Sequence, residues 1–125
     1  MFILAKLPNY AQEIKMRQTV ADNYNLKLKN LPLITPDIKS DRTSVWAQYT
    51  IRSSNRDDLQ EKLKQQGIST AVHYPMPLHQ QECFQYLMYK TKLPVSEQAA
   101  KEVMSLPMNP FIRDEEQDRV SNILQ

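Results

Sequence analysis

The chain has 125 residues, a length that suits one domain with one hydrophobic core. Its apolar fraction of 41%, its charged fraction of 24% and its net charge of +2 are ordinary for a globular protein. The charges are spread along the chain with no basic cluster among aromatic residues, so nothing supports nucleic-acid binding. The longest apolar run, "FILA" with the methionine before it, is too short for a membrane span or a signal-peptide core.

Glycine and cysteine are both used once. Gly67 is the only glycine, where average usage of about 7% would give about nine. A glycine-rich phosphate-binding loop therefore cannot be written, and the phosphate of any cofactor would need another kind of site. The single cysteine, Cys83, argues against a disulfide framework and is typical of a reducing compartment. We therefore predict a cytoplasmic protein.

The first half of the chain predicts two helices and a strand. Apolar residues at helical spacing predict a helix over 9–29, with Asn9 and Gln12 as its capping pair. Residues 30–44 contain two prolines and predict a loop, and the β-branched and aromatic run 44–53 predicts a strand. Residues 55–67 predict a helix that is capped by Asn55 and stopped by Gly67, with Ile68 packing back on Leu63.

The second half predicts short elements. We expect a strand over 68–74, short helices over 79–89 and 96–104, and an extended piece over 105–110. A last helix begins near Asp114, with Gln117 completing its cap. The order predicts an α+β fold: a small, mainly antiparallel sheet of about three strands with helices packed on one face.

The sequence "HYPMPLH", residues 73–79, which we name the corner, holds the only two histidines of the chain. Pro75 and Pro77 cannot continue a central strand, so they end the ladder in a fixed shape. Because neighbouring strand residues point to opposite sides, we expect His73 to face a cleft and Tyr74 to pack partly inward. Imidazole and phenol groups can donate hydrogen bonds to a sugar or a phosphate. The alternative is a purely structural turn.

Other chemistry is less well supported. His73, His79 and the nearest acid, Glu82, do not have the spacing of a zinc site, so we predict no metal site. Cys83 lies between aromatic residues without a neighbouring base and is typical of a small packed side chain. Trp46 and Tyr49 are more typical of a core than of a stacking platform.

Three stretches together resemble a known family over nearly the whole chain. They are "AKLPNYAQEIKMRQTVADNYNLKL", "WAQYTIRSSNRDDLQEKLKQQGISTAVHYPMPLHQQ" and "LPVSEQAAKEVMSLPMNPFI". In these stretches the chain is similar to the C-terminal part of DegT/DnrJ-type sugar aminotransferases. These enzymes depend on pyridoxal phosphate, have the aspartate-aminotransferase fold and aminate nucleotide-linked keto-sugars. The segments "WAQYT" and "AVHYP" are most similar to those of members that act on UDP-linked 3-keto sugars in lipopolysaccharide or O-antigen biosynthesis.

The resemblance implies which residues face the substrate. In the family the corner contributes to the nucleotide-sugar site, which makes His73 and Tyr74 the first candidates and Tyr49 the second. His79 matches a position that varies in the family. The family's larger domain carries the lysine and the phosphate cup for pyridoxal phosphate, so the resemblance implies no cofactor-binding or catalytic residue in this chain.

We therefore expect residues 1–125 to form a single C-terminal small domain. In this interpretation residues 1–8 are a remnant of the interdomain segment, residues 9–125 are the globular part, and the chain is truncated and inactive alone. The alternative is a non-catalytic binding or assembly module that complements a separately encoded large domain. The apolar residues of the segment 1–8 predict that it is disordered or buried against another copy.

Overall fold

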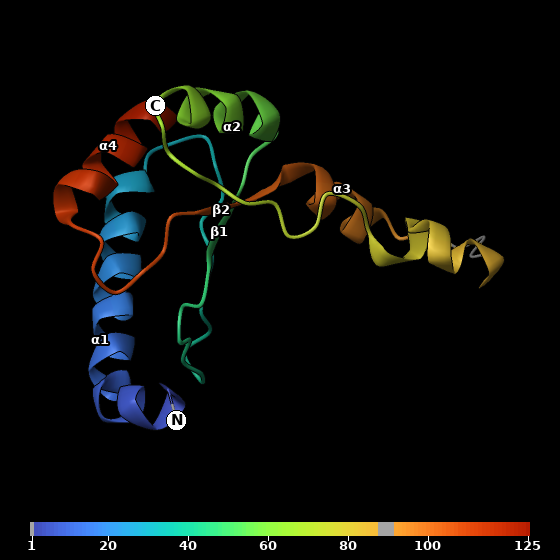
Figure 1. Ribbon diagram of the computed structural model, residues 1–125. Helices are drawn as coiled ribbons and strands as arrows, with labels where there is room; N and C mark the ends of the chain where they lie inside the picture. Colours follow the sequence, from blue (N-terminus) through green and yellow to red (C-terminus); the bar gives the residue numbers. More distant parts are fainter. Residues whose placement is uncertain (1, 88–91) are drawn as a thin grey trace.

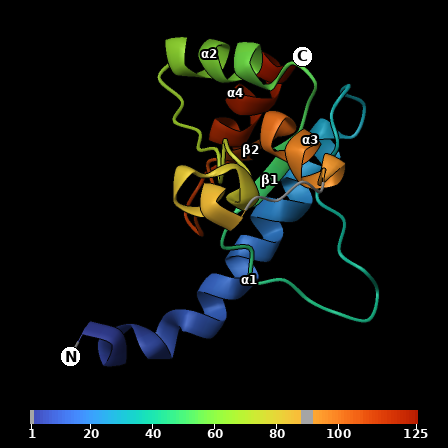
Figure 2. The same ribbon diagram turned by 90° about the vertical axis from the view of Figure 1, so that its right-hand side faces the viewer.

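A long N-terminal helix, α1 (Phe2–Leu28), is the support on which the other elements pack (Figure 1). The computed structural model describes residues 2–87 and 92–125. The 27 residues of α1 give a length of about 40 Å. Its buried side chains lie in the C-terminal half at helical spacing, and the N-terminal half extends beyond the rest of the fold (Figure 2). None of the described helices is long and apolar enough to cross a membrane.

The start of α1 differs from the prediction. The expected cap at Asn9 is wrong, because the helix already begins at Phe2 and continues through Pro8. A proline inside a helix removes one backbone hydrogen bond, and the first turns of α1 bend away from the rest (Figure 1). Leu4 is 73% exposed and Leu7 is 59% exposed, so these two side chains do not pack on their own chain. Its burial against a second copy stays a prediction.

The sheet consists of two antiparallel strands, β1 (Tyr49–Arg52) and β2 (Val103–Leu106). Tyr49 lies opposite Leu106, and side chains along β1 alternate between buried and half-buried. The predicted α+β class with a small antiparallel sheet is confirmed. The expected strand over 68–74 is reduced to a single bridge between Ala71 and Ser105, because the chain leaves the sheet before the prolines of the corner.

β1 is shorter than the predicted strand over 44–53 because of Trp46. The backbone of Trp46 lies in the left-handed region, with φ of 50°, so the extended conformation cannot run through it. Its indole is only 4% exposed, and the ring nitrogen Nε1 donates to Gln18 Oε1 at 2.8 Å. Burial of this large side chain against α1 offsets the cost of the unusual backbone.

Helix α2 (Arg56–Gln65) ends as the sequence predicts. Gly67 adopts φ of 73°, its N–H donates to the Lys64 carbonyl at 2.9 Å, and the Ile68 N–H donates to the Leu63 carbonyl at 2.9 Å. These two bonds form a Schellman motif, and Ile68 packs against the core beside Leu63. Asn55 occupies the N-cap position, but its side chain makes no capping hydrogen bond.

Two 3₁₀ segments, η1 (Leu78–Gln80) and η2 (Glu82–Leu87), replace the helix predicted over 79–89, whose last two residues lie outside the described residues. Helix α3 (Pro94–Glu102) begins two residues earlier than expected. The predicted end of this helix, Val103 and Met104, belongs to β2 instead. Val103 pairs with Arg52 of β1, which lies 51 residues earlier in the chain. Local periodicity cannot show such a partner.

Helix α4 (Asp114–Leu124) has its N-cap one residue before the predicted cap, Asp114, which is the first residue of the helix. Arg113 is the N-cap residue, and its backbone N–H donates to Glu116 Oε2 at 2.8 Å. Gln117, which the sequence suggested as a capping residue, is instead only 1% exposed and faces α1. Because the N-cap is Arg113 and not Asp114, Gln117 makes a buried contact with α1 instead of capping α4.

The helices α1, α2 and α4 form one layer, in which α4 packs on both α1 and α2, and α3 lies on the other side of the strands (Figures 1 and 2). The core lies between this layer and the sheet. Its buried apolar residues are Val20, Ala21, Tyr24, Leu28, Trp46, Tyr49, Ile51, Leu63, Met104, Leu106, Val120 and Leu124.

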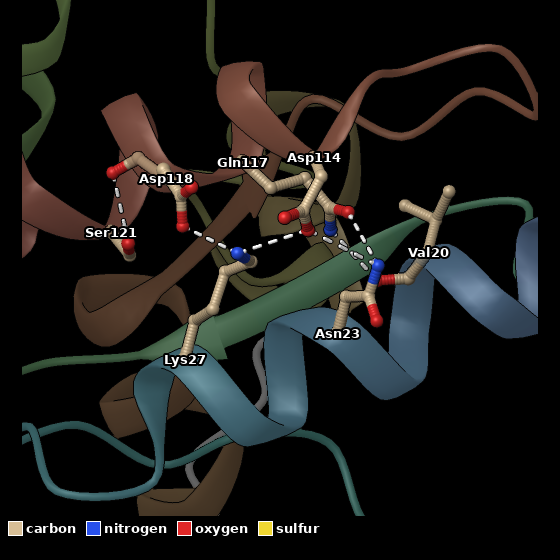
Figure 3. Close-up of polar contacts among 7 residues, drawn as sticks. All are labelled: Val20, Asn23, Lys27, Asp114, Gln117, Asp118 and Ser121. Carbon is tan, nitrogen blue, oxygen red and sulfur yellow. Dashed lines mark hydrogen bonds and ion pairs between the residues drawn. The ribbon is translucent and has the colours of Figure 1, made fainter.

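Polar contacts fix how α4 lies on α1 (Figure 3). The buried Gln117 donates from Nε2 to the Val20 carbonyl at 2.8 Å. Lys27 forms ion pairs with Asp114, at 3.0 Å, and with Asp118. A buried amide is costly unless it is hydrogen-bonded, so the bond from Gln117 favours this placement of α4 along α1.

We predict that Gly67→Ala destabilises the chain by about 1–2 kcal/mol, because alanine disfavours a positive φ. No atom lies within 4 Å of the added Cβ, so the backbone alone decides this cost. Gly67→Asn, which tolerates this conformation better, is the matched control and loses less. Urea unfolding measures both variants. Equal losses for the two would contradict the assignment.

Candidate functional site

The corner follows the Ala71 bridge and leads into η1. The peptide bond between His73 and Tyr74 is cis, and their two rings meet edge to face with centroids 5.8 Å apart. Pro75 and Pro77 follow at once and restrict the backbone dihedrals. The corner therefore presents an imidazole and a phenol next to each other on a proline-restricted turn.

Both side chains lie at the surface. His73 is exposed, and Tyr74 is 72% exposed. The expectation that Tyr74 packs partly inward is wrong, because residues 73 and 74 are not part of a strand and the alternation of strand side chains does not apply to them. Exposed groups of this kind can donate hydrogen bonds to a ligand without losing contacts inside the chain.

The corner is held at its two ends. At the upstream end, Ala71 and Ser105 exchange two backbone hydrogen bonds, of 3.2 and 2.7 Å. At the downstream end, Nε2 of His79 lies 3.3 Å from Oε1 of Glu97 in the first turn of α3, and the same oxygen accepts the Leu93 N–H at 3.1 Å. Among the described residues, the backbone of 72–76 makes no hydrogen bond with the rest of the chain.

Helix α3, to which the downstream end is attached, is in turn fixed to α2 and β1. The buried Arg56 donates from Nη1 to the carbonyls of Ala100, at 3.4 Å, and Val103, at 3.0 Å. A guanidinium at these carbonyls satisfies the C-terminus of α3 and complements its negative dipole end. Arg52 adds two hydrogen bonds to Glu102 Oε2, of 3.1 and 2.7 Å.

Tyr49, the second candidate from the resemblance, lies in the core instead of at the corner. It is fully buried, and its hydroxyl donates to Asn25 Oδ1 at 2.6 Å. Its ring packs against Tyr24, with centroids 4.9 Å apart, and against Trp46. Burial raises the pKa of the Tyr49 hydroxyl well above its usual range, so the group stays neutral. In this chain Tyr49 is thus a core residue, whereas the other two candidates, His73 and Tyr74, have exposed side chains.

A pocket of about 420 Å³ lies away from the corner, between the end of α2 and the start of α4. Gly67, Phe111, Glu116 and Arg119 are among its lining residues, and none of the corner residues is. The charged groups in its wall are already paired, Glu116 with Arg113 and Arg119 with the Gln66 carbonyl. The pocket therefore does not add to the corner site. Within the described residues, no group of three histidine, cysteine or acidic side chains could hold a metal ion.

The comparisons with known proteins place the chain in one family. The model of the DegT/DnrJ/EryC1/StrS aminotransferase family matches residues 2–125, and the chain belongs to that family. It is 47% identical over 110 residues to the UDP-2-acetamido-2-deoxy-3-oxo-D-glucuronate aminotransferase of Pseudomonas aeruginosa. The match covers 88% of this chain and 30% of that protein. It is 34% identical over 121 residues to the UDP-N-acetyl-3-dehydro-α-D-glucosamine 3-aminotransferase of Acidithiobacillus ferrooxidans, covering 97% of this chain and 32% of that protein.

Solved structures agree in fold. An aminotransferase of this family from Brucella abortus has a TM-score of 0.88 and 35% identity, over 97% of this chain and 32% of the other. NtdA from Bacillus subtilis, with bound PMP, has a TM-score of 0.80 and 30% identity, over 90% of this chain and 28% of the other. The chain thus spans about 30% of the length of the curated relatives it matches.

The lysines of the chain do not fit a pyridoxal phosphate site. A lysine that binds this cofactor covalently needs a desolvated pocket that lowers its pKa. Every lysine in the described part of the chain is exposed except Lys27. Hydrogen bonds to Asp118 and Asp114 raise the pKa of Lys27, which is the opposite change. The described residues therefore do not supply the cofactor lysine.

We predict that His73→Ala and Tyr74→Ala each change the free energy of unfolding by no more than about 0.5 kcal/mol, because both side chains are exposed. Tyr49→Ala, the buried control, loses about 3 kcal/mol or more. Denaturant unfolding compares the three variants. A loss near that of Tyr49→Ala at either corner residue would show that the corner is a structural turn.

We predict that stability falls as the pH drops through the acidic range. Hydrogen bonds from Gln98 and then Arg52 hold the pKa of Glu102 below its usual range, and those from Leu93 and His79 do the same for Glu97. Because the folded-state pKa is the lower one, this stabilisation is complete above the unfolded pKa of about 4.3 and is lost below it. Urea unfolding from about pH 6 to about pH 3 measures the loss.

Glu102→Gln separates one contribution to this pH dependence. It removes the carboxylate that Arg52 contacts, so the variant is less stable than the parent near neutral pH and loses less on acidification. An unchanged pH slope in the variant would show that Glu102 does not contribute.

Proposed function

We propose that this chain is the C-terminal small domain of a pyridoxal-phosphate-dependent aminotransferase that acts on a UDP-linked 3-keto sugar. The observation that carries the proposal is the exposed His73–Tyr74 pair on the corner of a chain that belongs to an aminotransferase family. The two relatives named above support the substrate class, since both are named for UDP-linked 3-oxo sugars. Incorporation of the product into lipopolysaccharide or O-antigen, in the cytoplasm, is part of the proposal.

In this function the corner binds and orients the nucleotide sugar. The His73 imidazole and the Tyr74 phenol are hydrogen-bond donors that suit sugar hydroxyls and phosphate oxygens. Pyridoxal phosphate, when bound in the whole enzyme, supplies the electron sink for amino transfer. Since the described lysines do not fit that cofactor, the amino-transfer chemistry comes from residues outside those described, in the same polypeptide or in a separate one.

The isolated 125-residue chain is therefore expected to be inactive. Mixed with pyridoxal phosphate and borohydride, it should retain no stoichiometric covalent label and show no transaminase activity. Mass spectrometry of the intact chain measures the label, and the Pseudomonas relative is the positive control. A single labelled site at full occupancy would overturn this part of the proposal.

A chimera tests the binding role of the corner. Replacing the matched segment of the Pseudomonas relative with this chain should give an active enzyme, because the two segments are 47% identical. In that chimera, His73→Ala and Tyr74→Ala should each raise KM for the UDP-linked keto sugar about tenfold, as expected for a lost hydrogen bond to a charged or buried partner. Lys62→Ala, an exposed change on α2, is the control. Unchanged kinetics in both corner variants would refute the binding role.

A further inference from the structure

We propose that the contact between His79 and Glu97 positions the corner for the nucleotide sugar, which makes His79 a positioning residue. The inference rests on the proposed function, since it concerns the same site. The family resemblance assigned no ligand role to His79, and in the structure its ring contacts Glu97. It is the downstream attachment of the corner to the rest of the chain.

The two histidines differ in their exposure to solvent. His73 is exposed, whereas the side chain of His79 is only 12% exposed and that of Glu97 is 31% exposed. A half-buried imidazole next to a carboxylate makes a stronger hydrogen bond than an exposed one. With a hydrogen on Nε2, the ring donates to Oε1 of Glu97 at 3.3 Å.

Glu97 is held in place by two hydrogen bonds with Leu93. Its Oε1 accepts the N–H of Leu93, the N-cap residue of α3, and its own N–H donates to the Leu93 carbonyl at 3.0 Å. The carboxylate therefore belongs to the rigid start of α3. In Figures 1 and 2 the 3₁₀ segments lie beside this end of α3. His79 thus attaches the corner to a helix and not to a loop.

The chain between the two attachments, the Ala71 bridge and the His79 contact, has few contacts of its own. Between the Ala71 bridge and His79, the backbone of 72–76 makes no hydrogen bond with other described residues. The prolines limit the dihedrals of the corner but do not fix its place on the molecule. The place is set by the two ends, so loss of the His79 contact frees the corner at one of them.

Hydrogen–deuterium exchange on the 125-residue chain tests the attachment. His79→Ala should raise exchange about tenfold in the peptide that covers η1, where the N–H groups of Gln80 and Gln81 donate to the Pro77 and Leu78 carbonyls, because loss of the contact with Glu97 loosens this turn. His79→Gln places an amide N–H close to the position of Nε2 and should restore most of the protection. Gln80→Ala, an exposed neighbour on η1, is the control. Exchange in His79→Ala equal to that of the control would overturn the inference.

Kinetics in the chimera test whether the His79–Glu97 contact matters for binding of the nucleotide sugar. His79→Ala should raise KM for the keto sugar about tenfold and change kcat less than about twofold, with rescue by His79→Gln. If His73→Ala and Tyr74→Ala raise KM but His79→Ala does not, the positioning role falls and the proposed function stands. If none of the three changes KM, the proposed function falls, and the positioning role falls with it.

Discussion

The packing of α4 on α1 is the interaction on which the rest of the structure depends. Gln117 is buried against the C-terminal half of α1, and its bond to the Val20 carbonyl favours this placement of the two helices (Figure 3). The same face of α1 carries Tyr24 and Leu28, against which β1 and β2 pack. Among the described residues, the buried polar side-chain atoms all have hydrogen-bond partners. The hydroxyl of the buried Tyr24, for instance, donates to the Pro107 carbonyl at 3.1 Å. Hydrogen bonds and ring packing therefore both hold the aromatic residues Tyr24, Trp46 and Tyr49 in place.

The corner depends on this core through a series of contacts. β1 and β2 are fixed against α1, Arg52 and Arg56 fix α3 beside β1, and Glu97 on α3 contacts His79. Each contact joins segments that are at least 18 residues apart in the sequence. The exposed His73–Tyr74 pair is thus placed by residues that do not contact it. This arrangement suits a binding surface, because a ligand contact is precise only when the supporting contacts are rigid.

The sequence predicted the parts of the fold that depend on local rules. The end of α2 at Gly67 followed from the one glycine in the chain, and the alternation of β1 followed from its β-branched and aromatic residues. The start of α1, the length of β1 and the loss of the strand over 68–74 depend on tertiary packing, which overrides local preference. The residue types of the strand predicted that Trp46 and Tyr49 belong to the core, which is confirmed, whereas the family resemblance pointed to Tyr49 as a second site candidate. The resemblance also pointed to His73 and Tyr74, but no local pattern could reveal that His79 contacts Glu97.

The central claim is that the core holds an exposed corner in place for a nucleotide sugar. Hydrogen–deuterium exchange of the chimera, with and without UDP-N-acetylglucosamine as a stable substrate analogue, tests it most directly. If the corner binds the nucleotide sugar, the ligand slows exchange in residues 73–79 and leaves the slow exchange of the α1–α4 contact unchanged. Slowed exchange confined to other segments, with residues 73–79 unaffected, would contradict it.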